Sequence, residues 1–162
     1  MAIDSVRPAG RQKRFGNAAL AFVALFWLGL LCGVSFLATP VKFQAPSLDL
    51  PTALEVGRVT FGLLAKVEWL MIILLAGSLA LGSLTRPRLV LATALLFIVA
   101  LQSLWLLPVL DVRIAAIVAG NPAAPTYHHT LYAFSEVAKA ILLGVLGGLA
   151  LAGLGARDRT RP

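Results

Sequence analysis

Four long apolar blocks are the feature that most limits what this chain can fold into. They run over residues 17–39, 63–84, 89–107 and 136–155. Each reaches the roughly 20 residues that an α-helix needs to cross about 30 Å of hydrocarbon. Backbone polar groups in lipid must be hydrogen-bonded within their own segment, and the alternating segments of about ten residues typical of membrane β-barrels are absent. The sequence therefore predicts an all-α fold, a bundle of four transmembrane helices.

The composition supports this prediction. Hydrophobic residues make up 59% of the chain and charged residues 13%, whereas a soluble domain averages about a quarter charged. We expect one transmembrane domain over residues 17–155, between a basic cytoplasmic segment (1–16) and a basic cytoplasmic tail (156–162). A cleavable signal peptide is the alternative for the first block, but its apolar run is long for one and no small-residue cleavage site follows it.

The positions of the cations predict an orientation in the membrane. The net charge of +7 could suggest nucleic-acid binding, but the basic residues flank alternate ends of the apolar blocks. Such a bias is typical of cytoplasmic loops in membrane proteins. We therefore predict no nucleic-acid partner, a bacterial inner-membrane location with both termini cytoplasmic, and outward-facing loops over 40–51 and 108–126. The cations concerned are Arg7, Arg11, Lys13, Arg14, Arg86, Arg88, Arg157, Arg159 and Arg161.

Helix-boundary signals predict that the second and fourth helices extend beyond the membrane on the outer side. The stretch "TALE" at 52–55 fits a capping box, which places the second helix over 52–84. The fourth helix would begin near the polar run that starts at Tyr127. The stretch "DVRIAAIVAG" predicts a separate short helix in the second outer loop, capped by Asp111 and lying on the membrane surface or against the bundle.

Small residues recur at helical spacing in the first and fourth blocks. They form the pairs Gly29–Gly33 and Gly144–Gly148. Without a hydrophobic force between helices in lipid, close backbone approach at such residues favours association. These four glycines predict a packing seam, either within the chain or with another chain.

A polar stripe opens the otherwise apolar fourth helix. On a helical projection His128, His129, Tyr132, Glu136 and Lys139 occupy about a third of the circumference. The second helix carries Lys66 and Glu68 at nearly the same depths as Glu136 and Lys139. We therefore predict polar contacts between helices two and four, which could be structural ion pairs, a ligand-binding site or a contact with a partner subunit. The candidate residues are Lys66, Glu68, Tyr132, Glu136 and Lys139.

The depths match two ion pairs, but the helix faces do not allow both. Lys66 is level with Glu136, and Glu68 with Lys139. Lys66 and Glu68 point about 160° apart on an ideal helix, so the pair Lys66–Glu136 is favoured. The remaining carboxylate would then need a bound ligand or a polar partner on another helix, such as Gln102 or Ser103.

Metal or haem binding has weak support in the sequence. Adjacent histidines on a helix point about 100° apart, and the chain has no third histidine to ligate a haem. His128, His129 and Glu136 are the candidate ligands of a mixed metal site. Because no catalytic triad, paired carboxylates or phosphate-binding loop occurs, we predict no resident cofactor and no enzymatic chemistry.

Three short stretches resemble a family of bacterial four-helix membrane proteins of unknown function related to animal transmembrane protein 205. The resemblance implies a four-helix bundle, and this family has no settled activity to transfer. The first stretch, "GVSFLATPVKFQA", carries Pro40, Val41 and Phe43, and the second, "WLLPVLDVRIAAI", carries Trp105, Pro108, Asp111 and Arg113. The third, "YHHTLYAFSEVAK", carries the histidine that opens the family's last helix, here His128 or His129.

Two functions remain open from the sequence. The first is a non-catalytic accessory or interaction subunit of a membrane assembly, which contacts lipid and either itself or another membrane protein. The alternative is a transport or small-ligand-binding or metal-binding protein with an outward-facing polar site between helices two and four.

Overall fold

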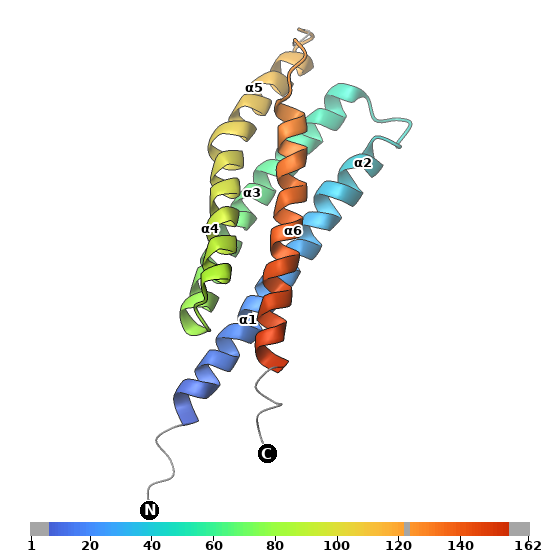
Figure 1. Ribbon diagram of the computed structural model, residues 1–162. Helices are drawn as coiled ribbons and strands as arrows, with labels where there is room; N and C mark the ends of the chain where they lie inside the picture. Colours follow the sequence, from blue (N-terminus) through green and yellow to red (C-terminus); the bar gives the residue numbers. More distant parts are fainter. Residues whose placement is uncertain (1–6, 122–123, 156–162) are drawn as a thin grey trace, which may run out of the picture.

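The described part of the chain forms four long helices. They run alongside one another in Figure 1. The computed structural model describes residues 7–121 and 124–155, and within these ranges every regular element is helical. The predicted all-α, four-helix fold is therefore confirmed. In chain order the elements are α1 (Arg7–Leu31), the π-helical segment η1 (Cys32–Ala38), α2 (Thr39–Lys42), α3 (Leu50–Leu81), α4 (Arg86–Leu101), the π-helical segment η2 (Gln102–Leu106), α5 (Leu107–Val118) and α6 (His128–Gly155).

These elements join into four helices of membrane-spanning length. α1, η1 and α2 are continuous, as are α4, η2 and α5, so the four candidate spans contain 33, 32, 33 and 28 residues. All four are apolar and long enough to cross a bilayer of about 30 Å, and the chain is a multi-pass membrane protein. The extra length predicted for the second and fourth helices is therefore shared by the first and third.

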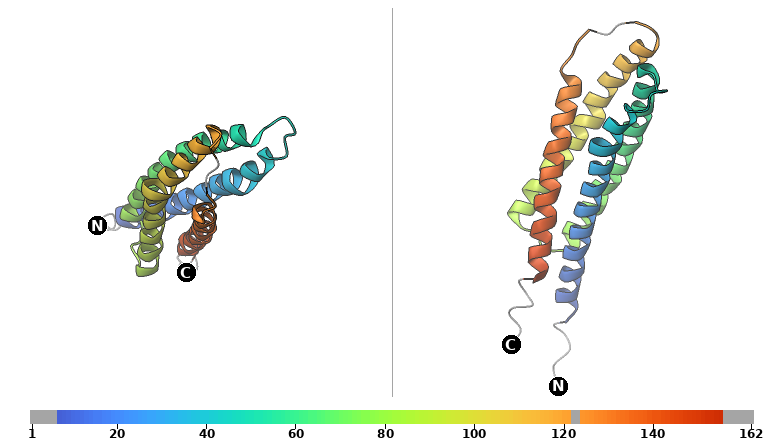
Figure 2. Two further views of the ribbon diagram at one scale, coloured as in Figure 1. Left: turned by 90° about the horizontal axis from the view of Figure 1, so that it is seen from above. Right: turned by 90° about the vertical axis from the view of Figure 1, so that its right-hand side faces the viewer.

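The two ends of the bundle differ in what they contain. The beginning of α1, the turn between α3 and α4, and the end of α6 lie together at one end, here called the terminal end (Figures 1 and 2). The α2–α3 and α5–α6 connections lie at the opposite end, here called the loop end. α1 and α4 each pack against both α3 and α6.

The predicted basic segment 1–16 overlaps α1, which begins at Arg7, while the predicted tail 156–162 lies outside the described residues.

The prediction of a separate short helix at 111–120 is wrong. These residues belong to α5 and continue the third long helix without a break. A proline inside a helix normally removes a hydrogen bond and clashes with the carbonyl four residues earlier. Here Pro108 follows the π-helical η2, in which the Leu107 amide donates to the Gln102 carbonyl, five residues back. The wider turn makes room for the proline ring, so the helix does not end there.

The same arrangement carries the first helix past Pro40. This proline follows η1, and the Thr39 amide donates to the Val34 carbonyl, again five residues back. The Thr39 hydroxyl donates to the same carbonyl at 2.8 Å. Both long helices that contain an internal π-helical segment therefore have a proline at the second position after it.

The N-terminus of α3 is capped differently from the prediction. The Asp49 carboxylate accepts a hydrogen bond from the Thr52 amide at 2.9 Å, and Pro51 lies in the first turn. Proline is suited to this position because its missing N–H would have no partner there. The hydrogen bonds from Thr52 lower the pKa of Asp49. Since protonation weakens them, this cap stabilises the helix above the ordinary carboxyl range and is lost as the pH falls through the lowered pKa.

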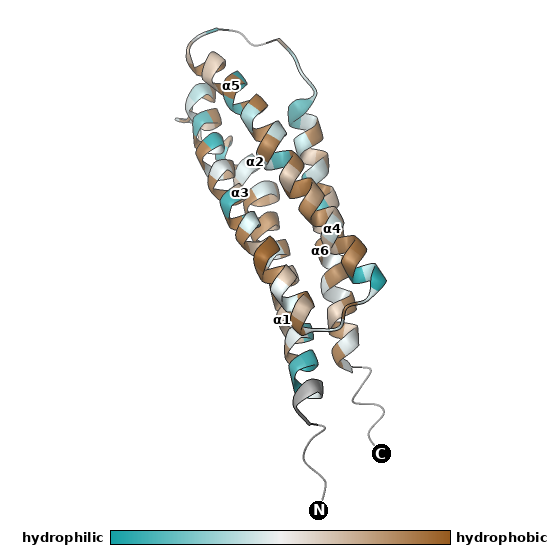
Figure 3. Ribbon diagram, turned by 90° about the vertical axis from the view of Figure 1, so that its left-hand side faces the viewer, coloured by the Kyte–Doolittle hydropathy of each residue, from teal (hydrophilic) through white to brown (hydrophobic). Residues whose placement is uncertain are grey.

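The apolar core occupies the middle of the bundle and its terminal end. It consists of side chains from the four long helices: Leu20, Ala21, Val23, Ala24, Trp27, Leu31, Met71, Leu75, Leu79, Leu95, Val99, Leu143, Leu146 and Ala150. Many large apolar side chains are exposed on the outside instead, and hydrophobic residues cover most of the length of the bundle in Figure 3. A chain with this surface contacts lipid along its membrane-spanning part.

The terminal end is held by a buried polar network. The Asn17 side-chain oxygen accepts hydrogen bonds from the Ser83 amide at 3.1 Å and from the Arg88 guanidinium at 2.8 Å. Arg88 is only 4% exposed and also donates to the Leu149 carbonyl of α6 at 2.7 Å. The arginine predicted as a cytoplasmic topology signal thus also joins α1, the α3–α4 turn and α6.

Close helix approach occurs at glycines other than the four predicted. A Cβ atom on Gly16 would lie 2.3 Å from the Gly82 backbone nitrogen, and one on Gly147 would lie 2.8 Å from the Leu25 side chain. Of the four predicted positions, a Cβ atom on Gly144 would lie 3.9 Å from the Leu28 side chain. A Cβ atom on any of the other three would have no described atom within 4 Å. The predicted seam therefore does not bring helices together within the described part of this chain; the four positions are Gly29, Gly33, Gly144 and Gly148.

We expect Gly16→Ala to destabilise the protein, because the added methyl group must push α1 away from the backbone at Gly82. Overpacking of this kind costs about 1–3 kcal/mol. Gly29→Ala is the matched control, since nothing lies within 4 Å of its Cβ position and alanine favours a helix by up to about 1 kcal/mol. Unfolding of the two variants in detergent tests this. Equal stability of both would contradict the close contact.

Candidate functional site

A lysine buried in the middle of the bundle contacts two buried carboxylates. Lys139 is fully buried, and Glu68 and Glu136 are each 2% exposed. The Lys139 ammonium lies 2.8 Å from Glu136 Oε1 and donates a short hydrogen bond to Glu68 Oε1. Glu136 and Lys139 lie one turn apart on α6, so a single ammonium reaches both carboxylates. We call these three residues the buried ionic cluster.

Neutral donors from the other two long helices complete the surroundings of the buried ionic cluster. The Trp27 indole N–H of α1 donates to Glu68 Oε1 at 3.1 Å. Glu136 accepts from the Ser35 hydroxyl of η1 at 2.7 Å and from the Gln102 amide of η2 at 2.8 Å. All four long helices thus contribute, and the donors to Glu136 both come from π-helical segments. Such segments inside α-helices occur frequently at functional sites.

The structure confirms one predicted ion pair and shows that the favoured one is wrong. Glu68 pairs with Lys139, whereas Lys66 is exposed on α3, and no ion pair joins it to Glu136 among the described residues. The buried face of α3 runs through Leu64, Glu68, Met71 and Leu75. This apolar stripe turns Glu68 inward and Lys66 outward. A lysine one turn from Glu136 on α6 supplies the positive charge instead.

Sequence reasoning missed the contributions of Trp27 and Ser35, and it gave Gln102 a different role. Gln102 was a candidate partner for Glu68, but it donates to Glu136 and, at 2.6 Å, to Ser135. One signal for Trp27 was available, because a tryptophan buried in an apolar helix needs an acceptor for its N–H. A serine such as Ser35 gives no comparable signal, since it can bond to its own helix backbone.

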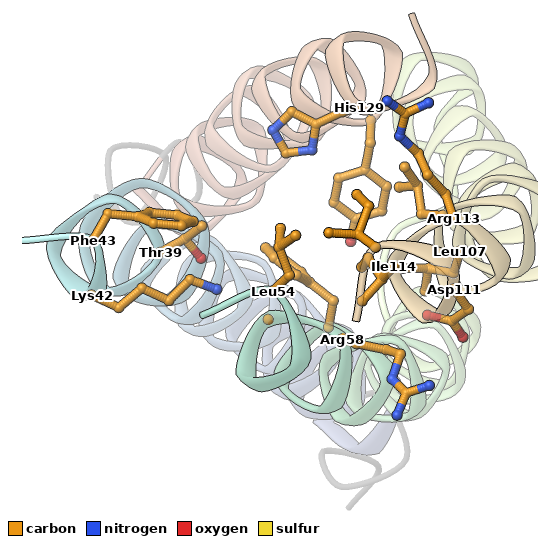
Figure 4. A pocket seen from close by; sticks show the side chains of 15 residues that line it. Thr39, Lys42, Phe43, Leu54, Arg58, Leu107, Asp111, Arg113, Ile114 and His129 are labelled. Atoms are coloured by element: carbon orange, nitrogen blue, oxygen red, sulfur yellow. The ribbon is translucent and has the colours of Figure 1, made fainter. Parts of the chain in front are cut away.

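A cavity opens above the buried ionic cluster, toward the loop end. It has a volume of about 250 Å³ and lies between α2, α3, α5 and α6 (Figure 4). Tyr132 lines it, is 5% exposed and packs edge-on against Phe61 with ring centroids 5.3 Å apart. Tyr132 and Glu136 are four residues apart on α6 and share a face, so Tyr132 lies between the cavity and the cluster. Most of the remaining wall is apolar, formed by Leu54, Leu107, Leu110, Ile114 and Ile117.

The charged groups around the cavity are mainly cationic. Arg58 pairs with Glu55 at 3.6 Å, and Arg113 donates to the Ala124 carbonyl and to the Thr126 hydroxyl. These two guanidiniums are held at the edge of the cavity. Besides Tyr132, the other charged or titratable lining side chains are those of Lys42, Asp111 and His129.

Lys42 is positioned differently from the two arginines. Its side chain points into the cavity in Figure 4. Its ammonium lies 5.1 Å from the Phe43 ring centroid and so close to Gly57 that a Cβ there would be 2.6 Å away. Among the described residues, no carboxylate forms an ion pair with Lys42. A half-buried cation therefore faces an apolar cavity without an acidic partner.

The candidate metal ligands are not gathered into one site. His128 stacks on Tyr127 with ring centroids 4.9 Å apart and meets the Trp105 ring edge-on at 5.8 Å. His129 lines the cavity, and Glu136 belongs to the buried ionic cluster. Within the described ranges, no three His, Cys, Asp or Glu side chains are placed to hold a metal ion.

The comparisons with known proteins give no relative. No family model, no curated protein and no solved structure matches the chain. The resemblance to the proteins related to animal transmembrane protein 205 therefore stays a prediction, and the function must be argued from the geometry.

We expect Lys139→Met to destabilise the protein strongly, because it leaves two buried carboxylates without their shared cation. Removing one partner of a buried ion pair costs about 3–5 kcal/mol. Lys66→Met is the matched control on the exposed face of α3 and should leave stability unchanged or slightly higher. Unfolding in detergent measures both. A similar loss in the two variants would contradict the special role of Lys139.

Proposed function

We propose that this protein binds a small amphipathic anion in the cavity at the loop end. The observation that carries the proposal is Lys42, a cation that points into an apolar cavity without an acidic partner among the described residues. An anionic group of a ligand would form an ion pair with Lys42. An apolar body would lie along the leucine and isoleucine side chains of α3 and α5. This is the small-ligand-binding function left open by the sequence.

The cavity size narrows the ligand class. Drug-sized ligands occupy sites of about 300–1,000 Å³. The volume here, about 250 Å³, suits a short apolar chain or a single ring rather than a haem or a dinucleotide. A carboxylate on such a body is the simplest ligand that matches both Lys42 and the apolar wall.

The distribution of cations supports a bacterial inner-membrane protein whose cavity opens away from the cytoplasm. Arg11, Lys13, Arg14 and Arg86 are exposed at the terminal end, where the positive-inside rule places the cytoplasm. The loop end, with its cavity, would then face the periplasmic side. Both termini would be cytoplasmic.

Thermal unfolding with hexanoate, hexanol and hexylammonium tests ligand binding. We expect hexanoate to stabilise most, by about 1.4 kcal/mol at ten times its Kd. In Ile114→Trp, which fills the cavity, all three should lose their effect, and in Lys42→Met hexanoate should lose its advantage over hexanol. Lys66→Met is the control, because it removes a lysine that does not line the cavity. Equal stabilisation by the anion and the cation in the unsubstituted protein would overturn the proposal.

A second candidate function, the interaction subunit, is favoured by the exposed position of Lys66. This lysine lies in the membrane-spanning part of α3 among Leu63, Leu70 and Ile73, which are 63%, 50% and 65% exposed. A charge in hydrocarbon is costly, by about 2.5–3.5 kcal/mol for lysine at the membrane centre. An acidic or carbonyl group of another subunit would reduce that cost, and so would extension of the lysine toward the headgroups.

We expect Lys66→Leu to weaken association if Lys66 is part of a subunit contact. Molecular mass in mild detergent, measured by light scattering, distinguishes the two explanations. A homo-oligomer or a bound partner that is lost on this substitution supports the interaction subunit. A protein that is monomeric before and after the substitution contradicts it.

A further inference from the structure

The buried ionic cluster contains more acidic groups than basic groups. Glu68 and Glu136 supply two carboxyl groups, and Lys139 supplies one ammonium. All three lie within candidate membrane spans, and none is more than 2% exposed. If all three were ionised, one negative charge would remain in excess in the interior of the bundle.

Among the described residues, the side chains that surround the cluster provide no second cation. The hydrogen-bonding side chains are Trp27 from α1, Ser35 from η1 and Gln102 from η2, and all are neutral. Tyr132, one turn away on α6, is a phenol. Arg88, the other buried cation of the described chain, belongs to the network at the terminal end. The excess charge is therefore not balanced by any group in the part of the chain that the structure describes.

An unbalanced buried charge is normally removed by protonation. Moving an isolated carboxylate out of water costs so much that such a group binds a proton instead. The two carboxylates also contact the same ammonium, so they lie close enough to repel each other. Two like charges in such proximity oppose simultaneous ionisation.

We infer that the buried ionic cluster is a proton-binding site, which holds one exchangeable proton shared by Glu68 and Glu136 at neutral pH. Proton uptake forms an O–H bond on a carboxylate oxygen, and release returns the proton to water. The site would be neutral with the proton bound and carry one negative charge after release. This inference does not depend on ligand binding in the cavity.

A proton fits this site better than a metal cation. The Lys139 ammonium already lies between the two carboxylates, where a metal ion would have to bind and would be repelled. A proton needs no coordination sphere and can bind to any free carboxyl lone pair.

Gln102 gives an independent sign that the cluster has capacity for a further donor. This residue is 1% exposed, and its amide nitrogen donates into the cluster, to Glu136. Its side-chain oxygen is buried, and no donor reaches it among the described groups. A buried acceptor without a partner is unfavourable, so the polar network can accept one further hydrogen-bond donor.

Tyr132 provides the connection between the proton site and the loop end. It lines the cavity and lies one helical turn from Glu136. A proton would therefore exchange with the loop-end side of the bundle, past the Tyr132 hydroxyl, rather than through the apolar core at the terminal end.

Infrared spectroscopy of the purified full-length protein at pH 7 tests the inference. The carbonyl stretch of a protonated carboxyl group is resolved from that of a carboxylate, and it shifts in D₂O when the proton exchanges. The other carboxyl groups of the described chain are exposed and do not share the buried environment that favours protonation, namely Asp49, Glu55 and Asp111.

The expected result is one protonated carboxyl group per chain, with a band that shifts in D₂O. Glu68→Gln and Glu136→Gln should each abolish the band, because the remaining carboxylate is then balanced by Lys139. Lys139→Met should double it, since both carboxyl groups must then be neutral. The two glutamine variants keep the test decisive if the methionine variant fails to fold.

Several results would overturn the inference. One is the absence of a protonated carboxyl band in the unsubstituted protein. Another is a band that keeps its full intensity in either glutamine variant, which would place the proton elsewhere. A band that does not shift in D₂O would show that the proton does not exchange. Loss of hexanoate binding with the band intact would refute only the cavity proposal.

Discussion

The ammonium of Lys139 is the interaction on which the arrangement of the bundle depends. It holds Glu68 of α3 and Glu136 of α6 at one depth in a region where neither carboxylate could remain ionised alone. Apolar side chains in lipid impose little preference on helix rotation or depth, because lipid is as apolar as they are. An ion pair between two helices fixes both their rotation and their depth. Trp27 and Gln102 extend the same constraint to the other two long helices.

The π-helical segments connect this buried centre with the space above it. η1 and η2 supply the serine and glutamine donors to Glu136. At the second position after each segment stands a proline, a residue at which helices commonly break. Because both helices continue past these prolines, α2 and α5 rise beyond the cluster and form two walls of the cavity. The polar site and the cavity are thus two results of the same local backbone geometry.

The sequence predicts the fold well because hydropathy and length alone determine four membrane-spanning helices. It also predicts the depth of the charged residues, since depth follows from counting along each helix. The side of α3 on which Lys66 lies was predicted wrongly. The prediction paired charges of equal depth and did not use the apolar stripe through Leu64, Met71 and Leu75, which defines the buried side. The continuous third helix was missed for a different reason. A proline ordinarily ends a helix, and nothing in the composition near Pro108 distinguishes a π-helical turn from a break.

The helix geometry before the two prolines also limits which insertions and deletions this chain can accept. Each residue of an α-helix adds about 100° of rotation and 1.5 Å of rise. Deletion of one residue between Trp27 and Pro40 would leave the hydropathy profile almost unchanged, and the chain would still insert as four helices. Because the π-helical η1 has wider turns than an α-helix, such a deletion has two outcomes: either η1 tightens to α-helical turns and loses the wide turn before Pro40, or the Lys42 ammonium rotates away from the side that now faces the cavity. Within these segments the spacing of residues is therefore a requirement of its own, which a hydropathy profile does not record.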